Sequence, residues 1–598
     1  MESHFPSYCG HSRREEYGTH VTAILRHLGA AFSVNSIPSR RRPAIKVAVV
    51  QLITLSAFTA FGRFDLALLA SLGLFAVLYA PDAPYRRRLI TVSGVALALF
   101  VCALLGIAVG DSAPLLLVAV IVLSSAASFA CTALVVGPPS AYFLMLGCGV
   151  VNYMVYQHDM PAGHVLIMTM VGGAVAVVGT MAELALQPHL PEKKAVHAAI
   201  TSVDTYEESE PGEPARALQR KASAALHGAW TALDDAAPLF PRAPWARRRM
   251  RTLTALRDDL ANAEHRFNVR LGDAAAHYFT GNRLDTEASS GLIDRMVGSA
   301  GASSGRPKAR VLLSHALSWP SENLVTASRV AVATIIAGIV TLALEGEHIY
   351  WSTAFAAVAL HMGGARIIQS YRAVNRLAGT VLGIGLFTLV VWSSPTAWVL
   401  VVILVSLQLL VELFVAKQYA LATLFITPLA LLISVGGQIP DDPWPIMGER
   451  LLDTVIGVVA AFIAIWLFGR SMPATVLRAQ TSRTLRSSAA FISEPDDPGP
   501  RESLYTDLRL LDSVTGAVTT EEGGSDAVHN GREIANIGYL LIGTRTLDAA
   551  SWNDARIEKV RSLMINASEE IGAGGRDMDT RIDALLTQLA ASIRIAER

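Results

Sequence analysis

The sequence predicts an all-α membrane protein with about twelve transmembrane helices in two parallel six-helix repeats, each followed by a cytoplasmic helical domain. Three observations lead to this fold class. Hydrophobic residues make up 52% of the 598 residues and charged residues only 17%, whereas a soluble chain contains about 25% charged residues. The apolar residues gather in two long blocks, each followed by a polar stretch. The second block repeats the order of features in the first, at an offset of about 285 residues.

The chain begins with a polar segment, 1–42, that lacks the charged, apolar and small-residue pattern of a cleaved signal. The first apolar block, 43–186, is divided at turn signals into segments close to the roughly 17 to 25 residues of a spanning helix. We expect the first of them to begin entry into the membrane. The six segments are 43–61, 64–80, 89–109, 114–136, 140–156 and 163–186.

The second apolar block, 321–469, is divided in the same way. In both blocks the second segment is short, which allows a tilted, re-entrant or shielded helix as well as a full span. The six segments of the second block are 324–344, 348–362, 373–392, 396–416, 419–435 and 446–468.

The two polar stretches, 187–320 and 470–598, show apolar residues at the 3.6-residue period of amphipathic helices. We expect each stretch to form a helical domain. A run rich in glycine and serine at 298–306 predicts a flexible linker back to the membrane.

The two apolar blocks align as copies of one unit, which indicates a duplication. Since each copy has six predicted helices, both copies enter the membrane from the same side and form a parallel repeat. One chain then supplies two units, so we expect a functional monomer. The aligned pairs are Tyr85 with Tyr371, Arg86 with Arg372, Thr169 with Thr454, and Gly172 with Gly457.

Positive charge in short loops marks the cytoplasmic side of a membrane protein. Arginines cluster before the first segment, at 40–42, and after the second, at 86–88. The corresponding turns of the second block contain Arg366, Lys417 and Arg470, whereas most alternate turns are acidic or neutral. We therefore expect a multi-pass protein of the inner cell membrane with both termini and both polar domains in the cytoplasm.

Several classes of function are disfavoured. Lys+Arg and Asp+Glu both total 50, so the chain lacks the basic excess of a nucleic-acid-binding protein. The four cysteines form no CxxC pair, which argues against a metal site. No GxxxxGK[ST] loop and no hydrolase or kinase signature occurs. We expect no enzyme activity, metal or cofactor, and solute movement that is passive or driven by an ion gradient.

One predicted helix of the second block places Arg372, Arg376 and Thr380 on one face, because they are four residues apart. The planar guanidinium group suits a carboxylate. This face, with the nearby Tyr350 and Trp351, is therefore a hypothetical substrate site for a small organic anion. Two structural alternatives stay open: the arginines anchor the helix at the cytoplasmic surface, and the aromatic pair belongs to an interfacial belt.

Four glycines are expected at helix–helix contacts. Gly379 and Gly383 form a GxxxG pair, and Gly172 and Gly457 occupy matching positions in the last helix of each block. Small residues of this kind let membrane helices approach closely.

The last apolar segment contains Glu449, Arg450 and Asp453. Asp453 is expected about one turn inside the apolar zone, where an ionisable residue indicates a function. One hypothesis gives these three residues a role in proton coupling. The alternative is a fixed ion pair between Arg450 and Asp453, which are three residues apart on one helix.

The second block contains EHIYWSTAFAAVALHMGG, RAVNRLAGTVLG, VAKQYALATLFITPLALLIS and ERLLDTVIGVVAAFIA. In these runs Arg376 precedes a Gly-Thr pair and Gly383, and Arg450 precedes an Asp-Thr pair and Gly457. This pattern resembles the fusaric acid resistance, or aromatic acid exporter, family (FUSC). The first block keeps the hydropathy and the order of segments but has lost several of these residues.

The resemblance implies an inner-membrane exporter of small aromatic carboxylates that is driven by the proton gradient, with the organic anion and the lipid bilayer as its partners. The plant aluminium-activated malate transporters are distantly similar, which leaves a passive organic-anion channel as an alternative. A membrane scaffold that recruits partners through its cytoplasmic helices is a third hypothesis. Whether a periplasmic component takes part is left open.

Overall fold

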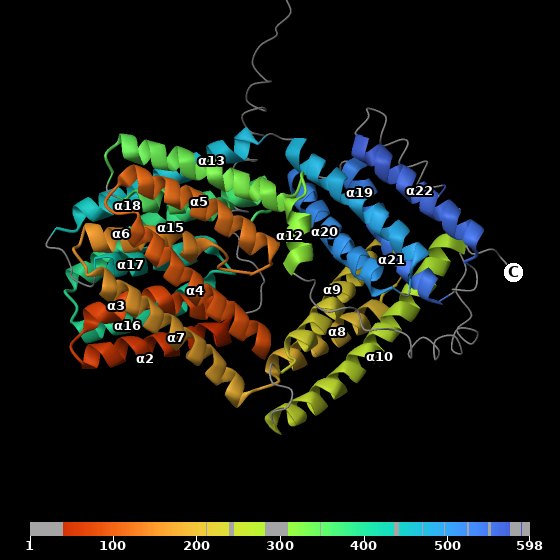
Figure 1. Cartoon of the computed structure of the whole chain (residues 1–598), viewed down its shortest axis with the longest axis horizontal. Coiled ribbons are helices and arrows are strands. Elements are labelled where there is room, and N and C mark those ends of the chain that lie inside the picture. The colour runs from red at the N-terminus through yellow and green to blue at the C-terminus, as the bar shows by residue number, and fades with distance from the viewer. Residues whose placement is uncertain are drawn as a thin grey trace, which may run out of the picture.

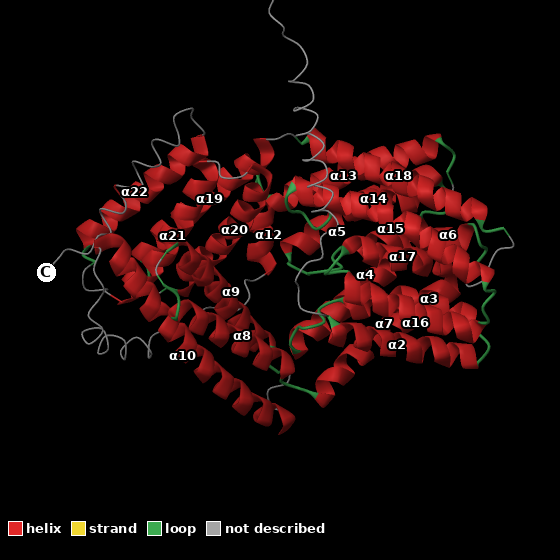
Figure 2. Cartoon of the chain, turned by 180° about the vertical axis from the view of Figure 1, so that it is seen from behind, coloured by secondary structure: helices red, strands yellow, loops and turns green. Residues whose placement is uncertain are grey.

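The computed structural model is built from helices (Figure 1). Within the described residues no strand occurs, and Figure 2 shows only helices joined by loops, so the all-α prediction is confirmed. The N-terminal segment before residue 40 and the linker expected at 298–306 lie outside the described residues. The described residues are 40–210, 212–238, 244–280, 309–346, 348–435, 442–468, 471–495, 497–522, 526–547, 552–573 and 588.

The helices of the first apolar block follow the predicted segments, with boundaries that differ by a few residues. The predicted loop at 86–88 belongs instead to the first turn of a helix, because Arg88 is buried there and pairs with Glu183, 2.7 Å away. The helices are α2 (Arg41–Ala60), α3 (Phe64–Leu74), the 3-10 turn η1 (Phe75–Leu78), α4 (Tyr85–Ala108), α5 (Ala113–Ala133), α6 (Tyr142–Tyr156) and α7 (Ala162–Leu186).

The helices of the second apolar block also follow the prediction, except that the third begins at Arg366, which was expected in a turn, and not at 373. Ser321 caps the first of them, since its hydroxyl oxygen accepts a hydrogen bond of 3.2 Å from the Leu324 N–H. The helices are α13 (Glu322–Ala343), α14 (Ile349–Leu360), α15 (Arg366–Trp392), α16 (Ala397–Phe414), α17 (Tyr419–Ser434) and α18 (Trp444–Leu467). Together, α2–α7 and α13–α18 form what we call the apolar bundle.

Eight of the described helices are long and apolar enough to cross a membrane. The four shorter apolar helices are the second and fifth of each block: α3 with η1, α6, α14 and α17. All 12 residues of α14 are buried, so a short helix here is covered by longer neighbours rather than by lipid. Both blocks therefore show the same order of helix lengths, which is long, short, long, followed by long, short, long.

The outer surface of the apolar bundle is apolar. Large side chains on several long helices are at least half exposed, and such a contiguous apolar surface fits contact with lipid. Examples are Ile90, Leu97, Val178, Leu389 and Leu467.

The four glycines expected at helix contacts all lie where a side chain would collide with a neighbour. A Cβ atom on Gly379 would lie 2.5 Å from the Ala420 main-chain oxygen, and Gly383 faces the same helix, α17. Gly457 faces α14. A Cβ atom on Gly172 would lie 1.9 Å from the Ala70 main-chain oxygen of α3. Each glycine thus permits a close contact within its own block.

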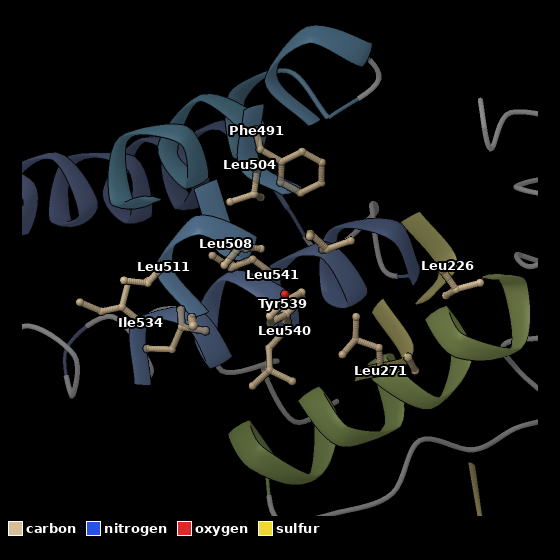
Figure 3. Packing of buried hydrophobic residues seen from close by; sticks show 14 of the residues in the cluster. Leu226, Leu271, Phe491, Leu504, Leu508, Leu511, Ile534, Tyr539, Leu540 and Leu541 are labelled. Atoms are coloured by element: carbon tan, nitrogen blue, oxygen red, sulfur yellow. The ribbon is translucent and has the colours of Figure 1, made fainter. Parts of the chain in front are cut away.

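The polar stretches form a second group of helices at one end of the apolar bundle (Figure 1). They share one hydrophobic core: Leu226 and Leu271 of the first stretch pack with Leu504, Leu508 and Leu541 of the second (Figure 3). We call this group the polar helix body. Its helices are α8 (Leu190–Glu207), α9 (Glu213–Asp235), α10 (Pro244–Thr280), α19 (Ser471–Ser493), α20 (Pro498–Glu522), α21 (Asp526–Leu547) and α22 (Asp554–Ala573).

The polar helix body contacts the apolar bundle where α15 begins. Arg366, the first residue of α15, places its Nε 2.8 Å from Oε2 of Glu521 on α20, and its main-chain N–H also donates to Glu521. The short helix α12 (Ala309–Leu317) leads into α13 at the same end. This contact fixes the direction of α15, which runs from the polar helix body toward the far end of the bundle.

Candidate functional site

A cavity of about 150 Å³ lies between the two blocks of the apolar bundle. Its walls come from α3, η1 and α6 of the first block and from α14 to α17 of the second. Aliphatic and aromatic side chains, among them Phe75, Phe143 and Trp351, form most of the lining. An apolar pocket with a few polar groups is typical of a small-molecule site. The polar side chains in its wall are Tyr142, His361, Arg376, Gln408, Glu412, Tyr419 and Ser434.

Helix α14 brings aromatic side chains to the centre of the bundle because small residues on its neighbours leave room for it. A Cβ atom on Gly149 of α6 would lie 2.0 Å from the Cβ of Tyr350, and one on Gly457 of α18 would lie 2.7 Å from the Cβ of Phe355. The Thr341 hydroxyl donates a hydrogen bond of 2.7 Å to Ser352 and ties α14 to α13. Trp351, on the same helix, forms part of the cavity wall.

Arg376 lies in the cavity wall and is 1% exposed. None of its three guanidinium nitrogens has a hydrogen-bond partner. Its Cζ atom lies 4.4 Å from the centre of the Phe355 ring, a cation–π contact that offsets part of the cost of burial. A buried charge without hydrogen bonds is costly, and the contacts of Arg376 within the described residues offset only part of that cost.

Arg450 is equally buried and lies against the same aromatic rings. Its Cζ atom is 3.6 Å from the centre of the Trp351 ring and 4.5 Å from that of Phe355. None of its guanidinium nitrogens has a hydrogen-bond partner, so the hydrogen-bonded pair with Asp453 that the sequence allowed is not formed. The guanidinium group stacks on the indole ring instead.

Asp453 and Thr380 are buried polar residues that also keep unused hydrogen-bonding atoms. Asp453 is 5% exposed and its Oδ2 has no hydrogen-bond partner. Thr380 is fully buried, one turn beyond Arg376 on α15, and its hydroxyl has no partner either. Neither residue forms part of the cavity wall.

Arg372 lies apart from the cavity. It is half-buried, one turn closer to the polar helix body than Arg376, and its Nη1 donates a hydrogen bond of 3.2 Å to the main-chain oxygen of Gly363. The helix face predicted from the spacing of Arg372, Arg376 and Thr380 therefore brings only Arg376 to the cavity.

Glu449 lies at the end of the apolar bundle that is farthest from the polar helix body. Its side chain is 43% exposed, and its Oε2 is 2.7 Å from Nδ1 of His348, which is almost buried. The His348 ring lies 4.5 Å from the ring of Tyr153 and 5.8 Å from that of Tyr350. The sequence analysis did not select His348 as a site residue. Its position two residues before Tyr350 was the signal that could have identified it.

Of the seven polar residues in the cavity wall, the sequence analysis selected only Arg376 as a site residue and not the other six, which include His361, Gln408 and Glu412. Glu412 is 6% exposed, and its Oε2 lies 3.6 Å from Nη2 of Arg40. Single polar residues within long apolar runs were the signal that could have found them. Within the described ranges, no group of three or more His, Cys, Asp or Glu side chains is placed to hold a metal ion.

The cavity, with the buried Arg376 in its wall, lies within a bundle that contains eight helices long and apolar enough to cross a membrane. Comparison with known proteins agrees with the resemblance predicted for the second block: residues 333–464 match the family described as "Fusaric acid resistance protein-like". The matched segment includes Arg376, Arg450 and all of α14.

A curated relative is the "Uncharacterized membrane protein YvaC" of Bacillus subtilis (strain 168). It is 25% identical over 290 residues, which are 47% of this chain and 45% of the relative. The match thus spans less than half the length of that relative. No solved structure matches the chain. The apolar helices and these two matches indicate a membrane protein whose residues 333–464 are similar to the fusaric acid resistance protein-like family.

Proposed function

We propose that this protein is a transporter that exports small organic acids, with aromatic carboxylates as the favoured class and the proton gradient as the source of energy. The cavity would bind the acid, and the residues around Asp453 would couple its movement to protons. The proposed location is the inner cell membrane.

The buried Arg376 in an otherwise apolar cavity is the observation that supports this function most. An aromatic acid has a flat apolar ring and one carboxylate. The apolar lining, with Phe75, Phe143 and Trp351, suits the ring. The guanidinium group offers the carboxylate two parallel N–H donors that no protein group uses.

Proton coupling is assigned to Asp453, with Glu449 at the far end of the bundle. Asp453 is buried, is not hydrogen-bonded to Arg450, and keeps a free carboxylate oxygen. Glu449 is in contact with solvent, one turn before it on α18. We propose that Asp453 takes up a proton from that side during each cycle.

The repeat and the topology are part of the proposal. The matching order of long and short helices in the two blocks supports a duplicated six-helix unit, 43–186 and 321–469. Both polar stretches lie at the same end of the bundle (Figure 1), which supports a common cytoplasmic side for 187–320 and 470–598. A cavity between the blocks of one chain supports a functional monomer.

The test is the efflux of a panel of acids from proteoliposomes that contain the purified protein. Benzoate, 4-hydroxybenzoate, malate and acetate are loaded, and their loss is followed with and without an imposed proton gradient. We expect the aromatic acids to leave fastest and an uncoupler to abolish their movement against a gradient. We expect Arg376→Gln to abolish the efflux of every acid in the panel.

Two results would contradict this function. Movement of anions down their gradient only, with no effect of the uncoupler, would indicate the passive channel. Absence of any acid flux, together with capture of a cytoplasmic partner by the polar helix body, would indicate the scaffold.

A further inference from the structure

Arg450 is the strongest unexplained feature of the apolar bundle. It is 1% exposed, its three nitrogens have no hydrogen-bond partners, and it does not form part of the cavity wall. Contact with the Trp351 and Phe355 rings offsets only part of the cost of burying a charge. Its N–H donors are therefore available to a ligand.

A second buried group faces the same region. Tyr350 is 1% exposed, and its hydroxyl has no acceptor. It is one residue before Trp351, whose ring Arg450 covers. Its ring centre lies 5.1 Å from that of Trp351, and the Cζ of Arg450 lies 3.6 Å from the centre of the same Trp351 ring. A guanidinium group and a hydroxyl that both lack acceptors are the donors that a carboxylate requires.

Two aromatic rings of α14 lie between this region and the cavity. Trp351 forms part of the cavity wall and stacks on Arg450. Phe355 contacts both guanidinium groups, with its ring centre 4.4 Å from the Cζ of Arg376 and 4.5 Å from that of Arg450. The two cations are thus neighbours separated by a partition of two aromatic side chains.

The two arginines also follow one another along the axis of the bundle. α15 starts at the polar helix body, so Arg376 is about 15 Å from that end at 1.5 Å per residue. α18 starts at the opposite end, so Arg450 is about 9 Å from the far surface. An acid that moves from the polar helix body to the far side would meet Arg376 first and Arg450 second.

We propose that Arg450 and Tyr350 form a second anion site, beyond the Trp351–Phe355 partition, which takes the carboxylate of the transported acid after it leaves Arg376. This inference rests on the proposed function and adds a second step to the path. The neighbouring Asp453 then sits beside the occupied second site, where the charge of the substrate favours its protonation.

The test separates binding from transport in the full-length protein. Benzoate binding to purified protein is measured by calorimetry, and benzoate efflux is measured in proteoliposomes. We expect Arg376→Gln to lose both. Arg450→Gln is expected to keep the dissociation constant of benzoate within about twofold of the wild-type value. It is expected to reduce benzoate efflux at least about tenfold, because the loss of one charged hydrogen bond has an effect of this size.

Two further variants complete the test, one at the second site and one as a control. Tyr350→Phe removes one oxygen and is expected to reduce efflux about threefold to tenfold with unchanged binding. Arg63→Gln is the matched control, since Arg63 is half exposed and pairs with Asp65 outside the bundle; it is expected to change neither quantity. Size-exclusion profiles confirm that each variant is folded.

The outcomes distinguish this inference from the function on which it rests. Full efflux in both Arg450→Gln and Tyr350→Phe, or loss of binding in Arg450→Gln equal to that in Arg376→Gln, would overturn the second site alone. If wild-type efflux depends on chloride and Arg450→Gln removes only that dependence, the site holds an inorganic ion and the assignment to the acid is wrong. A wild-type protein that neither binds nor moves any acid would overturn both proposals.

Discussion

Two kinds of buried arginine occur in the apolar bundle, and they differ in their partners. Arg88 is 2% exposed and donates to Glu183 and to main-chain oxygens of Pro81, Ala83 and Thr180. Arg376 is as deeply buried and donates to no group. A satisfied buried charge contributes to structure, whereas an unsatisfied one costs stability. Under the proposed function, Arg376 is retained because it binds the transported acid.

This contrast predicts opposite effects of the same substitution. Arg376→Met removes an uncompensated charge and fills the space with an apolar side chain, so the apparent Tm in detergent should rise while efflux is lost. Arg88→Met leaves Glu183 with Lys46 alone as its cation and removes the donor to three main-chain oxygens, so it should lower the Tm. Arg372→Met should impair efflux less than Arg376→Met. A lower Tm for Arg376→Met would contradict the view that its charge is uncompensated.

Asp453 allows a test of the coupling role. Because it forms no hydrogen bond with Arg450, Asp453→Asn should leave expression near normal, abolish accumulation of acid against a gradient, and keep passive exchange. Both activities are read from the same proteoliposomes. Loss of expression that Arg450→Gln restores, with active efflux intact, would instead show a structural pair and no coupling.

Glu264 provides a pH-dependent stability prediction outside the membrane. It accepts a hydrogen bond of 2.8 Å from the Trp230 indole, with Arg501 at 4.0 Å, yet burial raises the pKa of its carboxyl group above the usual value. The folded state therefore binds a proton on the Glu264 carboxyl group more tightly than the unfolded state does. As the pH rises through the range in which this carboxyl group loses its proton, the free energy of unfolding falls. Glu264→Gln should raise the Tm at pH 8 and have little effect near pH 4.

The gain at pH 8 is expected to be a few degrees, since about 1 kcal/mol shifts the Tm of a body of this size by roughly 2–4 °C. Glu208→Gln, an exposed residue of the same body, is the control and should show no such dependence. An equal gain for Glu264→Gln at both pH values would show that the effect is not electrostatic.

At the scale of helices, hydropathy and turn signals predicted the apolar helices to within a few residues, except for α15, which begins at Arg366 and not at 373 because its first two turns contain polar residues. Those signals depend on local sequence, so they can be read without a structure. The sequence left a fixed pair of Arg450 with Asp453 open as one alternative, because spacing along a helix does not specify the direction of a side chain, and Arg450 stacks on Trp351 of another helix. The cavity itself needs α3 and α6 beside α14 to α17, and sequence spacing does not specify contacts between helices so far apart in the chain.

Two glycines of α15 give a prediction about helix packing. Gly379→Ala would place a methyl group 2.5 Å from the Ala420 main-chain oxygen, so it should push α15 from α17 and lower the Tm. Gly385→Ala meets nothing within 4 Å and should be neutral or stabilising, because alanine favours a helix by about 0.5–1 kcal/mol over glycine. Thermal unfolding of the two variants should therefore give shifts of opposite sign, and equal shifts would contradict the close contact.

At the scale of the whole molecule, the polar stretches were expected as two helical domains, and the structure joins their helices in one core. Arg216 on α9 pairs with Glu533 on α21 at 2.8 Å, in addition to the shared leucines. The sequence shows that each stretch is amphipathic but not which surface covers the apolar face. This single body also contacts the start of α15, through the pair of Glu521 with Arg366.

This arrangement predicts the accessibility of two sites from opposite sides of the membrane. Asp159 lies in the turn between α6 and α7, at the far end of the bundle, and Glu208 is exposed at the end of α8 in the polar helix body. In a variant whose native cysteines are replaced by serine, Asp159→Cys should react with an impermeant maleimide added to intact cells. Glu208→Cys should react only after the cells are opened. The reverse pattern would place Glu449 on the cytoplasmic side, so that protons would enter Asp453 from the wrong side to drive export.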